Sequence, residues 1–275
     1  MNLNNEIKYN EKYNYNIDET VGWMNNADSS LENLSNLLGE VQESIIKVGN
    51  GTYSQNEMKS INADINEKIK EMADILNTTY GGKHIFSGTN VDDAPIKLIE
   101  NKDGTVALEF AKDKNGLVIA NRDSLKADIS DGVSIEYNVS VGDLFNITDE
   151  NGNNINLLEG VNKVSQLMND IANGDEQTAA KAKEELLGNT KSTIDKLFDH
   201  VVNERTSLGV RVSTAEKIKN FNEDNIVSMK TVLSQDQDVD QVEKFIELKS
   251  AELIYQASIQ VGAKLMQSTI LDYIR

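Results

Sequence analysis

The N-terminal part of the chain carries a long run of apolar positions that are spaced alternately four and three residues apart. The run comprises Ala27, Leu31, Leu34, Leu38, Val41, Ile45 and Val48. This heptad spacing is typical of a helix that packs against other helices along a continuous seam. Less regular apolar positions extend the run back towards Leu3, and the glycines of the GNGT stretch (49–52) suit a helix end. The pattern predicts a helix of about 47 residues.

A second helical pattern follows after a short link. Ser54 and Glu57 have the spacing of a capping box, in which each side chain bonds the free backbone N–H of the other at a helix start. The apolar positions that follow are Met58, Ile61, Ile65, Ile69, Met72, Leu76 and Thr79. We expect this helix to close at Tyr80 and to fold back antiparallel to the first helix, because the link between them is short.

Between residues 91 and 156 the helical period disappears. Short apolar or alternating runs replace it, at 96–100, 105–111, 117–120, 125–129 and 133–141. Most of the links between these runs contain an Asp-Gly or Asn-Gly pair, which favours tight turns between antiparallel strands. The pattern predicts a small antiparallel β domain that is inserted between helical segments.

The helical period returns at residue 157 and continues to the C-terminus. A short amphipathic helix is expected to begin after Asn156 and to end near Gly174. A single long helix is then expected from about 178 to 233, where no proline occurs. Its apolar positions are Leu186, Ile194, Leu197, Val201, Leu208, Val212, Ala215, Ile226, Met229 and Leu233. The polar stretch 234–241 predicts a break, with Asp238 capping a last helix.

The last helix carries two apolar stripes and has no remaining segment of the chain to cover them. Because exposed apolar surface of this width is unfavourable in water, we expect it to form an assembly interface with other subunits. The residues predicted for this interface are Val242, Phe245, Ile246, Leu253, Ile259, Val261, Leu265, Met266, Ile270 and Leu271. The other heptad seams favour an intramolecular bundle over an intermolecular coiled coil, since antiparallel seams of similar length can cover one another.

The expected fold class is therefore mainly α with a β insert (α+β), built as an elongated antiparallel helical bundle. Four regions are predicted: a helical rod with the first β strand, the inserted β domain, the second part of the rod, and the terminal assembly helix, at residues 1–90, 91–156, 157–233 and 234–275.

Three glycines surround a short apolar pair where the helices give way to strands. They are Gly81, Gly82 and Gly88, in the stretch YGGKHIFSGTN from Tyr80 to Asn90. Glycine adopts backbone conformations that other residues avoid. We interpret the three glycines as a structural hinge through which the chain leaves the second helix and enters the insert.

Composition excludes several function classes. A formal net charge of -18 argues against nucleic acid and against acidic membrane surfaces, because phosphate groups are bound by basic faces. The sequence contains no apolar run long enough for a membrane span, and MNLNNEIKYN lacks the apolar block of a signal peptide. The protein is thus expected to be cytosolic or to leave the cell by a route without such a signal.

Residues for catalysis or metal binding are scarce. The chain has no cysteine and only two histidines, His84 and His200, which are interpreted as ordinary packed or surface side chains. Asp236, Asp238, Asp240 and Glu247 occupy positions of a calcium loop, but Gln241 stands where that loop needs glycine, so these acids are interpreted as a helix N-terminus. Asn77, Asn138 and Asn146 head N-x-S/T triplets that are interpreted as chance. We expect no enzyme, cofactor or metal.

Four stretches resemble the flagellin-like family of flagellar proteins, in particular its hook-associated protein 3 members. They are IDETVGWMNNADSSLENLSNLL (17–38), GNGTYS (49–54), TTYGGKHIFSGT (78–89) and YQASIQVGAKLMQSTILDYIR (255–275). The β insert matches only loosely. Members of the family begin with a further helical segment, which packs against the C-terminal helix and carries the type III export signal. The resemblance implies that this chain lacks that segment.

The resemblance also implies a function. It implies an extracellular structural subunit that forms a homo-oligomeric ring between the flagellar hook and filament. The implied partners are the first hook-associated protein on the hook side, flagellin on the filament side, and an export chaperone for the C-terminal helix. Two alternatives stay open. The chain could be a flagellin that forms the filament itself, or, from a different class, a cytosolic coiled-coil scaffold or adaptor.

Overall fold

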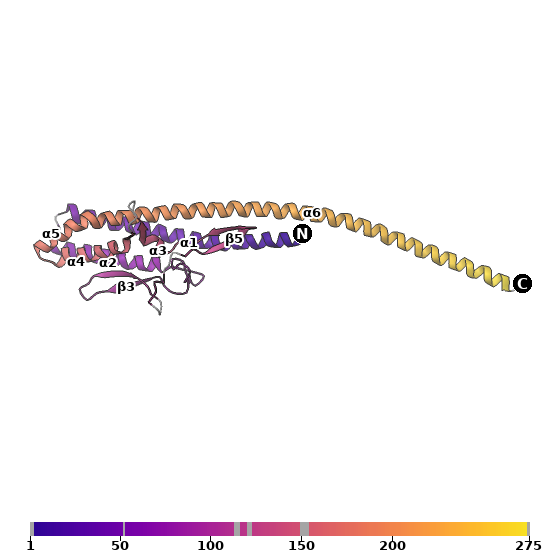
Figure 1. Cartoon of the computed structure of the whole chain (residues 1–275), viewed down its shortest axis with the longest axis horizontal. Helices are drawn as coiled ribbons and strands as arrows, with labels where there is room; N and C mark the ends of the chain where they lie inside the picture. The colour runs from indigo at the N-terminus through magenta and orange to yellow at the C-terminus, as the bar shows by residue number, and fades with distance from the viewer. Residues whose placement is uncertain (1–2, 52, 113–115, 120–122, 149–153, 274–275) are drawn as a thin grey trace. The chain divides into compact units, whose positions relative to one another are not determined.

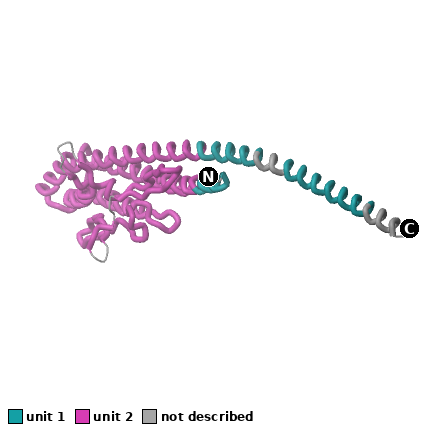
Figure 2. The backbone as a smooth tube through the Cα atoms, turned by 45° about the vertical axis from the view of Figure 1, so that its right-hand side comes forward, with its two compact units in different colours: residues 1–12, 221–275 teal, residues 13–220 magenta. Residues whose placement is uncertain are grey.

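The computed structural model describes residues 3–51, 53–112, 116–119, 123–148 and 154–273, and within the last range it leaves out the side chains of 236–241 and 265–273. The chain divides into two compact units (Figure 2). Unit 1 comprises residues 1–12 and 221–275, and unit 2 comprises residues 13–220. The predicted fold class, mainly α with a β insert, is confirmed by the order of the elements.

The first two predicted helices are present. Helix α1 spans Leu3–Asn50, and its heptad seam from Ala27 to Val48 is at most 1% exposed at every position. Helix α2 spans Gln55–Leu76, and the predicted capping box of Ser54 and Glu57 is formed at its start. Because the buried positions coincide with the heptad positions, the seam is covered within the chain itself.

The second half of the helical layer differs from the prediction at one point. Helix α4 (Leu157–Asn173) begins at Asn156 and ends at Gly174, as expected. The single helix expected from about 178 is instead divided into α5 (Glu176–Glu185), a π-helical turn (Leu186–Thr190) and α6 (Lys191–Tyr273). Gly188 lies inside this turn with φ -90° and ψ -106°. Since glycine tolerates such non-helical angles, it kinks the chain where absence of proline had suggested continuity.

Within unit 2, α1 and α6 run antiparallel. Gln42 on α1 donates a hydrogen bond to Asp195 (2.9 Å), Arg205 pairs with Asp28 (3.1 Å), and Lys219 pairs with Asp18 (2.6 Å). Residue numbers thus fall along α1 as they rise along α6. Helices α2 and α4 lie beside them (Figure 1), and Lys68 on α2 pairs with Glu40 on α1 at 3.0 Å. The helical part of unit 2 is an antiparallel bundle, as the seams predicted.

Within the described ranges, the strands form four two-stranded antiparallel hairpins. Their bounds are β1 Thr79–Tyr80 with β2 Lys83–His84, β3 Ile96–Glu100 with β4 Val106–Phe110, β5 Lys126–Ser130 with β6 Val133–Glu136, and β7 Asn146–Thr148 with β8 Asn154–Asn156. Neither the first nor the last of these hairpins was predicted. The expected strand at 117–120 is reduced to one bridge, between Lys112 and Val118, and residue 120 lies outside the described residues.

The strand expected over 133–141 is also shorter than predicted. It ends at Glu136, and the short helix α3 (Val141–Phe145) follows. Ser140 and Asp143 form a capping box at its start, because the Ser140 backbone N–H donates to the Asp143 carboxylate (3.1 Å) while the Asp143 N–H donates to the Ser140 hydroxyl (3.1 Å). The S-x-x-D spacing that starts a helix was therefore present in the sequence.

Residues 234–241 do not break the terminal helix. The backbone of α6 is helical through this stretch and continues to Tyr273. The polar residues interrupt the apolar stripe, but neither glycine nor proline occurs between Gly209 and Gly262, so nothing in the backbone forces the helix to end. The prediction that Asp238 caps a separate last helix is therefore wrong.

Candidate assembly surface

In unit 1, the C-terminal part of α6 presents large apolar side chains to solvent. Six residues of the predicted interface are described, and their exposed fractions lie between 54% at Ile259 and 66% at Leu253; the other four are Val242, Phe245, Ile246 and Val261. The remaining predicted residues, Leu265, Met266, Ile270 and Leu271, lie outside the residues whose side chains are described. We define the six described residues as the C-terminal apolar surface.

The exposed apolar area is wider than the predicted set. Leu248 and Tyr255 are not among the ten predicted interface residues and are 63% and 68% exposed. Ile254 is also outside that set and is 67% exposed. Its spacing of seven residues from Val261 was the available signal, since residues seven apart share a helix face. Apolar side chains thus cover much of the circumference of this stretch.

Four charged residues beside this surface form two pairs within the helix itself. Lys244 contacts Glu247 at 2.8 Å and Lys249 contacts Glu252 at 2.9 Å, each three positions apart. The Lys249 ammonium also lies 5.9 Å from the centre of the Phe245 ring. Such local pairs stabilise a helix by only about 0.2–0.5 kcal/mol each. The charges therefore leave the apolar residues available for contact.

Unit 1 also contains apolar residues that are buried, on both α1 and α6. Ile7 of α1 and Ile226 of α6 are 6% and 9% exposed. Lys230 of α6 forms an ion pair with Glu11 of α1 at 3.1 Å. Both pairs of residues belong to unit 1. Burial on α6 is thus observed beside the residues of α1 and is absent from the C-terminal apolar surface.

The hinge glycines lie in and after a β-hairpin in unit 2. The second helix ends at Leu76 and Tyr80 belongs to β1, so the expectation that Tyr80 closes the helix is wrong. Asn77 caps the helix instead, and its side chain pairs with the backbone of Ile96, accepting from its N–H (3.0 Å) and donating to its carbonyl (2.9 Å).

Gly81 and Gly82 form the two-residue loop between β1 and β2, with φ of 59° and 80°, and Gly88 has φ of 71°. A loop in which both residues have positive φ is the tight turn that suits a hairpin, and glycine adopts it without strain. Ile85 and Phe86, which follow β2, are fully buried. The backbone conformation agrees with the use of glycine there, while a hinge role stays a prediction.

Both histidines are held by backbone carbonyls. His84 Nδ1 lies 2.8 Å from the carbonyl oxygen of Asn77, and His200 Nε2 lies 2.9 Å from that of Asp143. Among the residues that the structure describes, no group of three or more acidic or histidine side chains is placed to hold a metal ion. The described helices also include none with the length and apolar character needed to cross a membrane.

Charged side chains in unit 2 form hydrogen bonds at helix ends and an ion pair with the insert. The backbone N–H and the hydroxyl of Ser54 donate to Glu57 and lower the pKa of its carboxyl group. The N–H of Thr178 donates to Asp175 at 2.7 Å and lowers the pKa of that carboxyl group. Glu100 on β3 and Glu67 on α2 raise the pKa of Lys70, which contacts each at 2.9 Å.

Comparison with known sequences shows similarity to flagellar proteins. Residues 1–91 match the family described as "Bacterial flagellin N-terminal helical region". The chain is 24% identical over 225 residues to flagellar hook-associated protein 3 of Escherichia coli K12, an alignment that covers 78% of this chain and 65% of that protein. It is 23% identical over 249 residues to the flagellin of Listeria monocytogenes, covering 90% of this chain and 72% of the relative.

Comparison with solved structures supports the same grouping at the level of the fold. The crystal structure of flagellar hook-associated protein 3 from Legionella pneumophila matches with a TM-score of 0.70 at 13% identity, covering 86% of this chain and 98% of that one. The resemblance to hook-associated protein 3 and flagellin that the sequence indicated is therefore confirmed. The chain spans 65% of the length of its hook-associated relative from Escherichia coli.

Proposed function

We propose that this protein is a structural subunit of the bacterial flagellum that joins the hook to the filament by self-assembly. The observation that carries the proposal is the C-terminal apolar surface on a fold that matches hook-associated protein 3. Burying apolar area is the main driving force of association between proteins. The six residues of the C-terminal apolar surface lie close together on one helix and are each more than half exposed, so we assign the contacts between subunits to them.

We also propose the partners that the resemblance to hook-associated protein 3 implies. The proposed assembly is a homo-oligomeric ring outside the cell, with the first hook-associated protein on one side and flagellin on the other. Export through the flagellar type III system, with a chaperone that covers the terminal helix beforehand, fits an apolar surface that is otherwise open to water. Assembly requires no chemical step, so the proposal assigns no catalytic residue.

The position of the protein on purified flagella tests this proposal. Antibodies raised against the chain, visualised by electron microscopy, are expected to label one short zone between hook and filament. Label along the whole filament would instead support the flagellin alternative, which the match to the flagellin of Listeria monocytogenes keeps in view. Label confined to the cytoplasm, with none on the flagellum, would favour the scaffold and contradict the proposal.

A pair of variants tests the surface itself. Leu253→Ser with Ile259→Ser removes two exposed apolar side chains from the C-terminal apolar surface. We expect this double variant to fold as a monomer but to incorporate into flagella at least about tenfold less well, since each lost contact weakens association. Val210→Ser is the matched control, because Val210 lies on the same helix and is 62% exposed. Normal incorporation of the double variant would contradict the assigned interface.

A further inference from the structure

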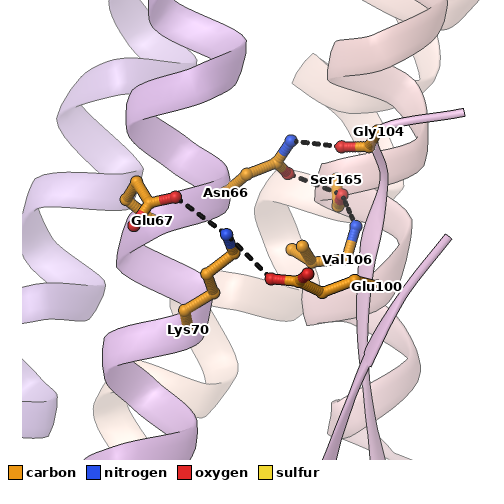
Figure 3. Close-up of polar contacts among 7 residues, drawn as sticks. All are labelled: Asn66, Glu67, Lys70, Glu100, Gly104, Val106 and Ser165. Atoms are coloured by element: carbon orange, nitrogen blue, oxygen red, sulfur yellow. Dashed lines mark hydrogen bonds and ion pairs between the residues drawn. The ribbon is translucent and has the colours of Figure 1, made fainter. Parts of the chain in front are cut away.

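The hairpin formed by β3 and β4 is held against helices α2 and α4 by side chains that bond its backbone. Ser165 on α4 is fully buried, and its hydroxyl accepts from the Val106 N–H (2.9 Å) and donates to Asn66 of α2 (2.7 Å). The Asn66 amide in turn donates to the Gly104 carbonyl (2.9 Å), next to the start of β4. Figure 3 shows these contacts converging on the end of the hairpin.

Asn162 of α4 bonds the same edge of β4, two residues beyond Val106. The Asn162 side chain accepts from the Leu108 N–H (2.7 Å) and donates to the Leu108 carbonyl (2.9 Å). An amide side chain that accepts and donates at one residue reproduces the pair of bonds that a neighbouring strand would make. Asn162 and Ser165 are three positions apart and so lie on one face of α4.

The register of the hairpin explains why the side chains of α4 can bond the backbone of Val106 and Leu108. Leu108 pairs with Leu98 and Val106 pairs with Glu100 across the two strands. Backbone groups of alternate residues point to the same edge of a strand, so Val106 and Leu108 both present their N–H groups away from β3. Both residues are nearly buried, at 4% and 1% exposure, so their polar groups need protein partners.

An ion pair acts on the same end of the hairpin. Lys70 of α2 contacts Glu100, the last residue of β3, at 2.9 Å, and Glu67 one turn earlier on the helix, also at 2.9 Å (Figure 3). Both strands are thus tied to the helices near the turn. Exposed ion pairs contribute little, however, so the buried contacts of Ser165 and Asn66 carry most of the attachment.

From this geometry we propose that α4 acts as a surrogate strand for β4. Asn162 and Ser165 supply the partners that a third strand would give, fix the hairpin in one register on the helices, and close the β4 edge to strands of other molecules. An open strand edge is a template for pairing with another chain. In a protein proposed to assemble through its terminal helix, closing this edge restricts association to the intended surface.

Hydrogen exchange of the complete chain tests the docking role. In Asn162→Ala, the backbone amides of residues 106–110 are expected to exchange at least about tenfold faster, with the helical circular dichroism unchanged. Ser165→Ala is expected to produce the same change at Val106. Asn169→Ala is the control, because Asn169 lies on α4 and its side chain bonds only Asn173 among the contacts described. Unchanged exchange at residues 106–110, or loss of helix together with the hairpin, would overturn the proposal.

Sedimentation of the same proteins tests closure of the edge. Asn162→Ala is expected to associate at a concentration at least about tenfold lower than the unchanged chain and Asn169→Ala, because its β4 edge can accept another strand. Asn162→Asp keeps the acceptor for the Leu108 N–H and is expected to fall between the two. Faster exchange in Asn162→Ala without stronger association would overturn the edge-closing part of the proposal.

Discussion

The two halves of helix α6 carry similar apolar patterns with opposite outcomes. In unit 2, the predicted seam positions Ile194, Leu197, Val201, Leu208 and Ala215 are at most 1% exposed. In unit 1, every described residue of the C-terminal apolar surface is more than half exposed. Heptad spacing therefore specifies a helix and its apolar face, but it leaves open whether the partner lies in the same chain.

The largest expected difference between the halves is in stability. Leu197→Ala removes a fully buried side chain and should lower the free energy of unfolding by about 2–5 kcal/mol, because it leaves a cavity. Leu253→Ala removes an exposed one and should change it by no more than about 0.5 kcal/mol. Urea denaturation of the monomer measures both values. Equal losses would show that the C-terminal apolar surface is covered within the monomer.

The next effect comes from the turn of the β1–β2 hairpin in unit 2. Gly82→Val places a β-branched residue at φ of 80° and should cost roughly 1–3 kcal/mol. Faster hydrogen exchange is expected at the covered residues 194–215, while exchange at 242–261 should not change. Gly39→Val is the control, since Gly39 is helical and an added Cβ meets no atom within 4 Å. Normal stability of Gly82→Val would refute the importance of this turn.

A smaller effect on stability is expected from glycine-to-alanine substitutions, which change helix preference without changing packing. Gly209 and Gly262 lie in the two halves of α6, and an added Cβ meets no atom within 4 Å at either position. Alanine favours helix over glycine by up to about 1 kcal/mol. Gly209→Ala should therefore raise the free energy of unfolding of unit 2, whereas Gly262→Ala should slow only local exchange around residue 262. A global gain from Gly262→Ala would contradict the independence of the exposed half.

The smallest expected effect is a pH dependence of the stability that the Glu57 cap contributes to unit 2. Glu57 has a pKa lowered from its ordinary value of 4.5, so its cap stabilises the fold above about pH 4.5 and loses that contribution as the pH falls through the lowered value. The unchanged chain should exceed Glu57→Gln in stability at neutral pH, and the difference should shrink on acidification. Glu71→Gln, further along α2, is the control. Thermal melts across this pH range measure the difference, and a constant difference would contradict the cap.

Much of the helical layer could be predicted because its signals are local. The seam from Ala27 to Val48 and the capping box at Ser54 depend on spacing alone, and both are present. The predictions failed at two places in this layer. Gly188 kinks a proline-free segment, and α6 continues through the polar stretch 234–241, where a break was expected.

The candidate surface was also predictable in part. Its residues were found from their apolar spacing, because helix geometry places them on shared faces. The contacts that hold the hairpin were not found, since Asn66, Asn162 and Ser165 resemble ordinary polar helix residues. Their role depends on backbone groups 38 to 59 positions away in the sequence.

The sequence by itself determined the helical seams, the capping box at Ser54, the turns and the apolar character of the terminal helix, because these depend on periods of a few residues and on the conformations that glycine permits. Only the tertiary structure decided which seams are covered, which residues of α1 and α6 pair within unit 2, and which side chains bond the hairpin edge. Those outcomes depend on contacts between distant segments, and local spacing carries no information about which distant residue becomes a neighbour.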